Sequence, residues 1–382
     1  ADSPRGITES RLVLWKDTTG SDNWVAQGGT DDAANNHVTL TGVSSFSEWA
    51  IAEASDLTLS KANNVSGSAV VGQSWNWTLT AANTGSPATF AAGQVILTDN
   101  LPNSNLNYGT PTVQNVANIT GSANISCSIV GNDLTCTANG GSVTFDSNLG
   151  ASSFDVVFSA TPQATGTYQN PRTGGGIAQI DPNNAVVESN ESNNSPVANS
   201  VTVGKANTTT TITSDNPDAS VVGQTVTVQW SVTVNSPGST GVALTGDVTV
   251  SDGTNQCVAA VSVGQCDIIF TSAGAKNLTA TYAGDSNYNG SASSPTTPHT
   301  VNKADTTTSI TSDNPDPSSP AQSVTVQWTV TPTSPGSGTP TGTVTVTVSG
   351  GAETCNAPVA NGQCSLTLNG TGARTITANY AE

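Results

Sequence analysis

Thr225-Val226-Thr227-Val228-Gln229-Trp230-Ser231-Val232-Thr233-Val234 is the stretch that decides the fold class of this chain. Apolar residues occupy every second position, and successive side chains of a β-strand point to opposite faces. The pattern therefore predicts a strand with one buried face and one wet face. Trp230 at its centre is expected to anchor the core. Turn signals containing Gly, Pro, Asp or Asn follow roughly every 8 to 15 residues, which is typical of a β-sandwich.

The same stretch recurs as part of a tandem duplication with an offset of 98 residues, uninterrupted by insertions. The offset carries Ser214-Asp215-Asn216-Pro217-Asp218 onto 312–316, and it carries Lys205, Trp230, Cys257, Cys266 and Tyr282 onto Lys303, Trp328, Cys355, Cys364 and Tyr380. We predict one domain at 205–303 and a second at 304–382. Glu382 aligns with Gly284, so the strand expected near 291–301 has no counterpart in the second copy. Either the natural chain continues, or another subunit donates that strand.

Composition excludes several classes of protein. The 382 residues carry 9 basic and 27 acidic side chains, for a net charge of −18. Nucleic-acid binding is excluded, because it needs clustered Lys and Arg, and nine cations spread over 382 residues form no cluster. A membrane-spanning helix is excluded as well, because no window approaches the roughly 18 apolar residues of a span. The length suggests two to four domains. The chain lacks methionine and begins at Ala1, which we interpret as a processed protein or a fragment of a longer one.

Two further units precede the repeats. Residues 55–204 open with Asp56-Leu57-Thr58-Leu59-Ser60-Lys61 and contain the alternating Trp75, Trp77 and Leu79. Residues 1–54 are predicted to be the C-terminal half of a β-domain, with strands at 11–15, 23–26, 37–40 and 46–50. The predicted fold class is all-β: tandem β-sandwiches in an extended array, with a partial β-domain at the N-terminus.

These segments resemble known bacterial families. Residues 205–303 resemble the bacterial immunoglobulin-like (Ig-like) repeat, on the motifs at 206–210, 246–250 and 281–288. Residues 55–204 resemble a conserved repeat domain of bacterial surface proteins, and 180–194 resemble the signature of a cell-adhesion-related bacterial domain. The resemblances imply that the tandem β-sandwiches are Ig-like and that the protein is displayed on the cell surface or secreted, and they imply no catalysis.

The cysteines form three pairs with one spacing: Cys127 with Cys136, Cys257 with Cys266, and Cys355 with Cys364. Each pair brackets a short Gly-containing segment, so the two cysteines can face each other across a hairpin. Zinc sites and redox motifs use shorter Cys-x-x-Cys spacings. We predict three structural disulfides, which place the protein outside the cytosol.

No cofactor is predicted, but calcium is a candidate ligand of one acidic segment. Asp181, Asn183, Glu188 and Glu191, together with Asn190, offer hard oxygen ligands within a short segment. The same residues could instead form turns through hydrogen bonds to the backbone. The segments 214–218 and 312–316 are read as Pro-stiffened linkers, with calcium binding as the weaker alternative.

A covalent bond between strands is a further alternative for the second unit. Lys61 on the first strand could join Asn199 near the end, with Asp99 as a buried acid between them, although a solvated Lys61 is the simpler interpretation. Nucleophilic catalysis would need a His beside a Ser or Cys. His37 and His299 are predicted to be surface residues, so no enzyme is expected.

The sequence thus predicts a non-catalytic stalk, spacer or adhesion-associated segment of a bacterial surface or secreted protein. Neighbouring domains or copies of the same chain are the expected partners. Two alternatives stay open: a filament subunit assembled by strand donation, and a glycan- or surface-binding adhesin. The second would need an exposed aromatic platform, whereas Trp75 and Trp77 on one face are better explained as core.

Overall fold

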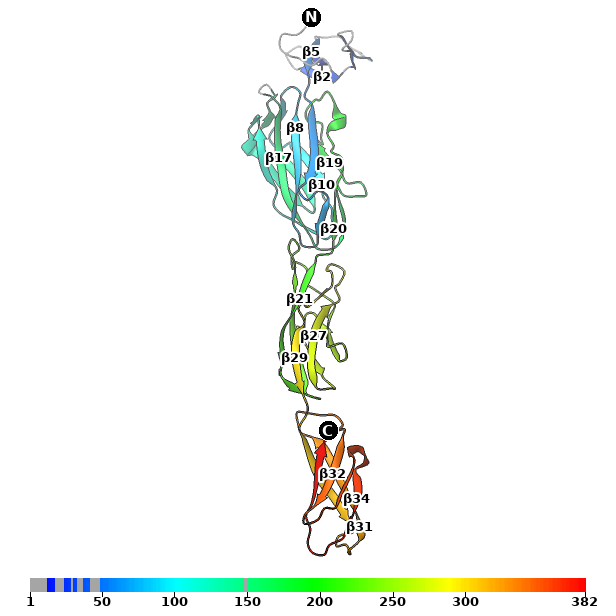
Figure 1. The fold of residues 1–382 in the computed structure, drawn as a ribbon. Coiled ribbons are helices and arrows are strands. Elements are labelled where there is room, and N and C mark those ends of the chain that lie inside the picture. Colours follow the sequence, from blue (N-terminus) through cyan, green and yellow to red (C-terminus); the bar gives the residue numbers. More distant parts are fainter. Residues whose placement is uncertain (1–11, 18–23, 29, 33–36, 42–48, 148–149) are drawn as a thin grey trace. The chain divides into compact units, whose positions relative to one another are not determined.

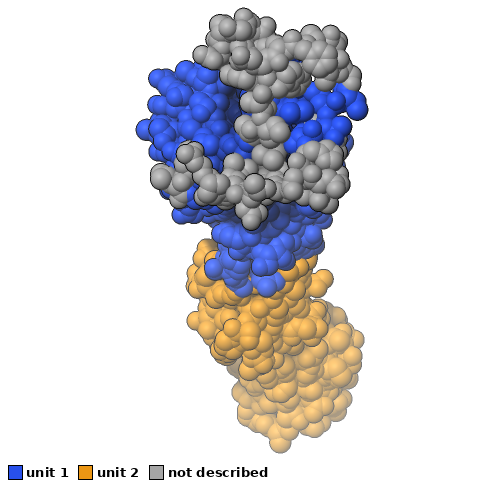
Figure 2. Space-filling view, turned by 90° about the horizontal axis from the view of Figure 1, so that it is seen from above, with its two compact units in different colours: residues 1–207, 234–243, 286–288 blue, residues 208–233, 244–285, 289–382 orange. Residues whose placement is uncertain are grey.

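The computed structural model describes residues 12–17, 24–28, 30–32, 37–41, 49–147 and 150–382. Regular structure in these ranges consists of β-strands and short 3₁₀ turns, which confirms the all-β class (Figure 1). No helix in the described ranges is long and apolar enough to cross a membrane. The chain divides into two compact units (Figure 2): unit 1 holds 1–207, 234–243 and 286–288, and unit 2 holds 208–233, 244–285 and 289–382. The finer division into four domains stays a prediction.

The first strands of unit 1 form a small sheet and a hairpin. The sheet has the order β2-β1-β5, and β3 pairs with β4. Three predicted strands are found, β3 is additional, and most of the strand predicted at 46–50 lies outside the described residues. The bounds are β1 (Leu12–Asp17), β2 (Trp24–Gly28), β3 (Thr30–Asp32), β4 (His37–Thr39) and β5 (Trp49–Glu53).

The rest of unit 1 is a sandwich built from four short sheets. Their orders are β11-β17-β8-β6 with β12 on β17, β14-β15-β10-β19, β13-β16-β9 and β18-β20-β7. The bounds are β6 (Leu57–Asn63), β7 (Ser68–Val70), β8 (Trp75–Asn83), β9 (Ala88–Phe90), β10 (Val95–Asn100), β11 (Leu106–Tyr108), β12 (Thr112–Ala117), β13 (Ile119–Thr120), β14 (Ile125–Val130), β15 (Asp133–Ala138), β16 (Val143–Phe145), β17 (Ser152–Pro162), β18 (Gly166–Asn170), β19 (Ala178–Ile180) and β20 (Asn199–Gly204), with 3₁₀ turns η2 (Ser122–Asn124) and η4 (Glu191–Asn193).

Strict alternation explains why the long central strands form. In β8 every second side chain is buried, from Trp75 through Trp77 to Asn83, and β17 repeats the pattern along its whole length. The two strands are antiparallel, with Phe158 opposite Trp77. Their buried faces and those of β10 and β15 pack into one core. Burial of large aromatic side chains supplies much of the stability of such a core.

Unit 2 holds the second copy of the duplication and most of the first, whose residues 205–207, 234–243 and 286–288 belong to unit 1. The strands of the first copy are β21 (Thr208–Asn216), β22 (Ser220–Val221), β23 (Thr225–Val234), β24 (Asp247–Ser251), β25 (Gln256–Ala260), β26 (Gln265–Ile269), β27 (Gly274–Tyr282), β28 (Ser291–Ala292) and β29 (Thr297–Asn302). Those of the second are β30 (Thr306–Asn314), β31 (Gln322–Pro332), β32 (Thr343–Val348), β33 (Thr354–Pro358), β34 (Gln363–Leu368) and β35 (Ile376–Ala381), with a 3₁₀ turn η5 (Val359–Asn361).

The two copies share one strand order, as the duplication requires. The first pairs β21-β23-β26 in one sheet and β25-β24-β27 in the other, and the second pairs β30-β31-β34 and β33-β32-β35. Trp230 and Trp328 are both buried, so the predicted core anchors are confirmed. In the first copy β27 also pairs with β29, the strand predicted near 291–301. The counterpart of β27 in the second copy is β35, which pairs only with β32 among the described residues.

Candidate functional site

A buried group of three polar side chains is the most unusual feature of unit 1. Lys61 shares the inward face of β6 with Leu57 and Leu59, because side chains two apart on a strand face the same way. Asp99 follows the buried Leu97 by the same step on β10, and Asn170 follows the buried Tyr168 on β18. Three strands from three different sheets therefore point a cation, an acid and an amide into the core.

The three side chains are in direct contact. The Nζ of Lys61 donates to the Oδ1 of Asp99 and to the Oδ1 of Asn170, each at 2.8 Å, and lies 2.8 Å from the Oδ2 of Asp99. The side chains of Lys61 and Asp99 are 0% exposed, and so is Asn170. The interpretation of Lys61 as a solvated residue is therefore wrong.

Asn199, the predicted partner of Lys61, belongs to a different contact. Its Oδ1 accepts hydrogen bonds from the side-chain amide of Asn63 at 2.7 Å and from the indole of Trp77 at 3.1 Å. Asn199 pairs with Asn170 across β20 and β18, so the two amides are neighbours in the sheet. The sequence signal that could have found Asn170 is its place on the same strand face as Tyr168.

Burial shifts the titration of the ion pair. Loss of solvent lowers the pKa of Lys61, and the negative charge of Asp99 acts in the opposite direction. The pKa of Asp99 is raised, also chiefly by burial, against the cation of Lys61. Both shifts favour the uncharged forms, because a low-dielectric interior penalises charge.

The acidic segment 181–194 uses its predicted ligands for local hydrogen bonds. The carboxylate of Asp181 accepts from the backbone N–H of Ala185 and of Val186, each at 2.8 Å. Asn190 caps the 3₁₀ turn η4 by accepting from the N–H of Ser192. These are the turn contacts that the sequence offered as the alternative to calcium. Calcium binding by Asp181, Asn183, Glu188 and Glu191 stays a prediction.

Glu188 ties this segment to the start of β6. One carboxylate oxygen accepts from the N–H of Leu57 at 2.6 Å, and the other accepts from the side-chain amide of Asn194 at 3.0 Å. Burial raises the pKa of Glu188 to about 7, and the charges of Glu191 and Asp181 act in the same direction. A carboxyl group that titrates near neutrality therefore holds the two segments together.

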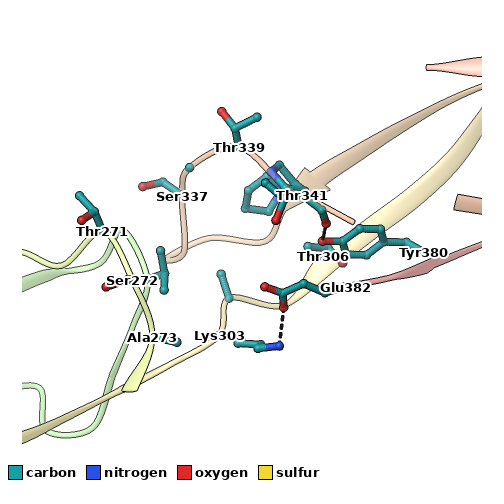
Figure 3. A pocket seen from close by; sticks show the side chains of 15 residues that line it. Thr271, Ser272, Ala273, Lys303, Thr306, Ser337, Thr339, Thr341, Tyr380 and Glu382 are labelled. Atoms are coloured by element: carbon teal, nitrogen blue, oxygen red, sulfur yellow. Dashed lines mark hydrogen bonds and ion pairs between the residues drawn. The ribbon is translucent and has the colours of Figure 1, made fainter. Parts of the chain in front are cut away.

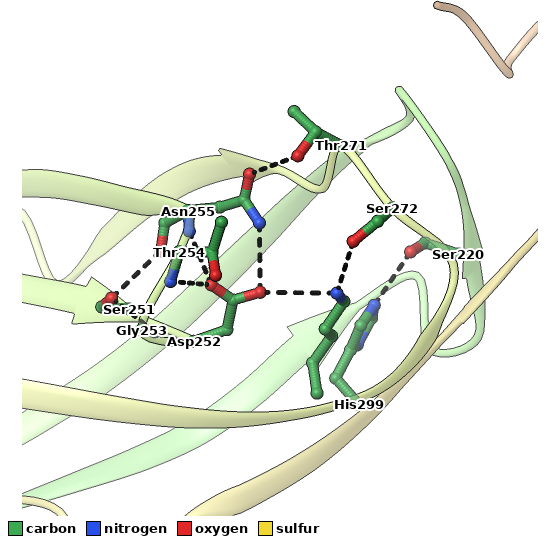
Figure 4. A network of polar contacts seen from close by, with 10 residues as sticks. Ser220, Ser251, Asp252, Gly253, Thr254, Asn255, Thr271, Ser272 and His299 are labelled. Carbon is green, nitrogen blue, oxygen red and sulfur yellow. Dashed lines mark hydrogen bonds and ion pairs between the residues drawn. The ribbon is translucent and has the colours of Figure 1, made fainter.

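His299 in unit 2 is buried, so its prediction as a surface residue is wrong. Its Nδ1 lies 2.9 Å from Asp215 and 3.4 Å from Asp218. Its Nε2 lies 2.9 Å from the hydroxyl of Ser220, as Figure 4 shows. The ring stacks on Phe270 with a centroid distance of 4.9 Å. The side chain of His37 lies outside the described structure.

The His299 group has the connectivity of a Ser-His-Asp triad but lacks access. Ser220 is 1% exposed and His299 is 2% exposed, so a substrate carbonyl has no path to the hydroxyl. Within the described residues, Asp215, Asp218 and His299 are the titratable groups close enough to share a metal ion. The segment 214–218 is not a linker between domains, because residues up to Asn216 belong to β21.

All six cysteines form the predicted disulfide pairs. Cys127 and Cys136 face each other across the β14–β15 hairpin, as predicted. The other two pairs differ, because β25 and β26 belong to different sheets, and so do β33 and β34. The expected hairpin arrangement is wrong for these pairs: each disulfide joins the two sheets of its sandwich. The turn between the two cysteines carries the chain from one sheet to the other.

The remaining candidates are a surface pocket and the aromatic face of unit 1. A pocket in unit 2 is lined by small polar residues, among them Thr271, Ser272 and Ser337, beside an exposed ion pair between Lys303 and Glu382 at 2.6 Å (Figure 3). Trp75 and Trp77 are 1% and 0% exposed, and their rings meet edge to face at 5.5 Å. They are core residues and form no platform for a ligand.

The fold and duplication agree with a comparison against known families. Residues 212–302 match the family model described as a bacterial Ig-like domain (group 3). Most of the first repeat is therefore similar to a bacterial Ig-like domain. The second repeat has the same strand order and shares Trp328, Cys355, Cys364 and Tyr380 with the first at the 98-residue offset, so the matched fold is duplicated in the chain.

Solved structures give weaker likenesses. The major pilin subunit of Bacillus cereus is 12% identical over 73% of this chain and 77% of its own, with a TM-score of 0.28. The Escherichia coli adhesin FdeC is 14% identical over 85% of this chain and 92% of its own, with a TM-score of 0.20. The C-terminal domain of the Streptococcus agalactiae AgI/II polypeptide BspA is 10% identical over 64% of this chain and 99% of its own, with a TM-score of 0.26. No curated protein matches the chain.

Proposed function

We propose that this chain is a non-catalytic spacer, a stalk segment of a bacterial surface or secreted protein that holds another part away from the cell. The observation that carries the proposal is the tandem pair of Ig-like repeats, each with its own buried apolar residues and a disulfide between its two sheets. Ser220 and His299 are buried, so the one triad-like group among the described residues does not favour an enzyme.

Two properties of the chain support a spacer displayed outside the cell: its disulfides fit the location, and its charge fits dense display. Disulfides persist in oxidising compartments and are rare in the cytosol. The net charge of −18 on 382 residues makes neighbouring chains repel one another, which keeps a densely displayed protein from associating without specificity.

Small-angle X-ray scattering of the chain in solution tests the spacer. A compact chain of 382 residues would have a radius of gyration of about 21 Å. We expect a value at least about 1.5 times larger, because domains strung in series cannot share one core. A value near that of the compact chain would contradict the spacer and leave the assignment of the Ig-like domains intact.

A second candidate is assembly by strand addition between chains, at the edge of β35 that pairs with no strand other than β32 among the described residues. An unpaired strand edge offers a row of N–H and C=O groups to another strand. In the first repeat β29 covers the equivalent edge of β27. Strand addition between chains predicts a scattering mass that rises with protein concentration, and a peptide with the sequence of residues 291–302 should suppress the rise. A constant monomer mass would dismiss filament assembly through this edge.

An adhesin that binds glycans through an aromatic platform is not favoured. The two tryptophans that could have formed it, Trp75 and Trp77, are enclosed in the core of unit 1. Adhesion would then depend on other parts of the natural protein, with this chain as their support.

A further inference from the structure

The group formed by Lys61, Asp99 and Asn170 has the composition of a reaction centre. A primary amine lies against a carboxamide, with a carboxyl group beside both. The Nζ of Lys61 is 2.8 Å from the Oδ1 of Asn170, and the carbonyl carbon is bonded to that oxygen at about 1.23 Å. The amine is therefore within about 4 Å of the carbon that it would attack, close to the separation of a near-attack geometry.

The environment favours the reactive protonation states. An amine is nucleophilic only when it is neutral, and burial is the largest influence on Lys61, whose pKa it lowers. The pKa of Asp99 is raised by the same cause, so this carboxyl group can hold the proton that the amine gives up. The other charged or titratable groups that act on Asp99 or sense its charge are Arg172 and Tyr108.

Water is excluded from the group, and the amide nitrogen is weakly held. Lys61, Asp99 and Asn170 have no exposed side-chain surface, and Tyr108, which senses the charge of Asp99, packs on Trp77 and Phe158. The Nδ2 of Asn170 lies near Asp99 but makes no hydrogen bond of good geometry among the described residues. A buried amide with an unpaired nitrogen is costly as a purely structural element.

We propose that Lys61 and Asn170 join in an intramolecular amide bond, formed by the folded protein itself with Asp99 as the proton carrier. The ammonium of Lys61 first passes one proton to the carboxylate of Asp99. The neutral amine then adds to the side-chain carbonyl carbon of Asn170 and forms a tetrahedral intermediate. Asp99 delivers its proton to the nitrogen that was Nδ2 and accepts one from Nζ, which makes that nitrogen a leaving group.

The C–Nδ2 bond then breaks and ammonia departs. One C–N bond has formed, one has broken, and nothing has been oxidised or reduced. The carboxyl group of Asp99 ends neutral beside ammonia, or charged if ammonia leaves as ammonium. No co-reactant is needed, because the leaving group comes from Asn170 itself.

The bond would fasten the first strand of the sandwich to a strand near its end. Lys61 and Asn170 are 109 residues apart in sequence, so the bond would close most of residues 55–204 into one covalent ring. Tension applied at the two ends of this domain would then pass through the bond and bypass the chain between them.

Intact-mass spectrometry of the reduced, denatured chain decides the proposal. We expect the wild-type mass to fall short of the sequence mass by one ammonia, and a tryptic digest to contain a branched peptide that joins the segments around Lys61 and Asn170. Asp99→Asn and Lys61→Arg should each restore the full sequence mass, and Asn170→Asp should lose one water in place of ammonia. Asn199→Ala is the matched control and should keep the loss of ammonia.

A wild-type chain with its full sequence mass would overturn the proposal, whatever the variants do. A branched peptide that contains Asn199 in place of Asn170 would also overturn it. Because the wild-type spectrum is decisive alone, a variant that fails to fold leaves the outcome of the test unchanged.

Discussion

At the scale of single residues, the molecule places titratable groups where solvent cannot reach them. Lys61, Asp99, Glu188 and His299 are all enclosed, and each has a specific partner. Buried charges are expensive unless they are paired, so these positions constrain the fold more than the many exposed Thr and Ser residues do. Glu188 gives this constraint a dependence on pH.

Glu188 is expected to make unit 1 less stable as the pH rises. Its pKa is about 7 in the folded protein, above the ordinary value of 4.5, so the folded state binds the proton more tightly than the unfolded chain does. This contribution is present in full below pH 4.5 and is lost as the pH rises through about 7. From pH 5 to pH 8 it amounts to at most about 3 kcal/mol in the free energy of unfolding.

Urea unfolding at the two pH values measures this change. In Glu188→Gln the residue no longer titrates, so the difference between pH 5 and pH 8 should shrink by the same amount. Equal pH dependence in the wild type and the variant would show that another group is responsible.

At the scale of elements, the disulfides between β25 and β26 and between β33 and β34 fasten the sheets of each repeat. Reduction should lower the free energy of unfolding of each repeat by about 2.5–3 kcal/mol, as expected for a ring of about ten residues. Chemical denaturation of Cys257→Ser/Cys266→Ser against the wild type measures the loss. A difference below about 0.5 kcal/mol would contradict this stabilisation by the closed ring.

The strands were predictable from the sequence, and the partners across the core were not. Alternation from Val226 to Val234 indicated β23 within one residue, because the period of two is local. The pairing of Cys257 with Cys266 was also local, but the spacing could not show that the intervening turn changes sheet. Lys61 and Asp99 were found, whereas Asn170 was missed in favour of Asn199, since only the fold shows which of two neighbouring amides faces the lysine.

At the scale of the whole molecule, the proposed spacer consists of modules in series that fold separately and transmit tension. Each repeat has its own buried core, as Val326, Val344 and their neighbours show for the second copy. A spacer needs this independence, because the loss of one module then leaves the others folded.

Stretching single molecules by their two ends tests the independence of the modules most directly. We predict separate unfolding events: the first repeat should lengthen the chain by about 250–300 Å and the second, which is about 20 residues shorter, by about 200 Å, with about 30 Å more per repeat after reduction of its disulfide. The separate events follow from the independent core of each repeat. The extra length after reduction is that of the loop that each disulfide closes. A single event that releases the whole chain, or smooth extension without events, would contradict a spacer built from independent modules.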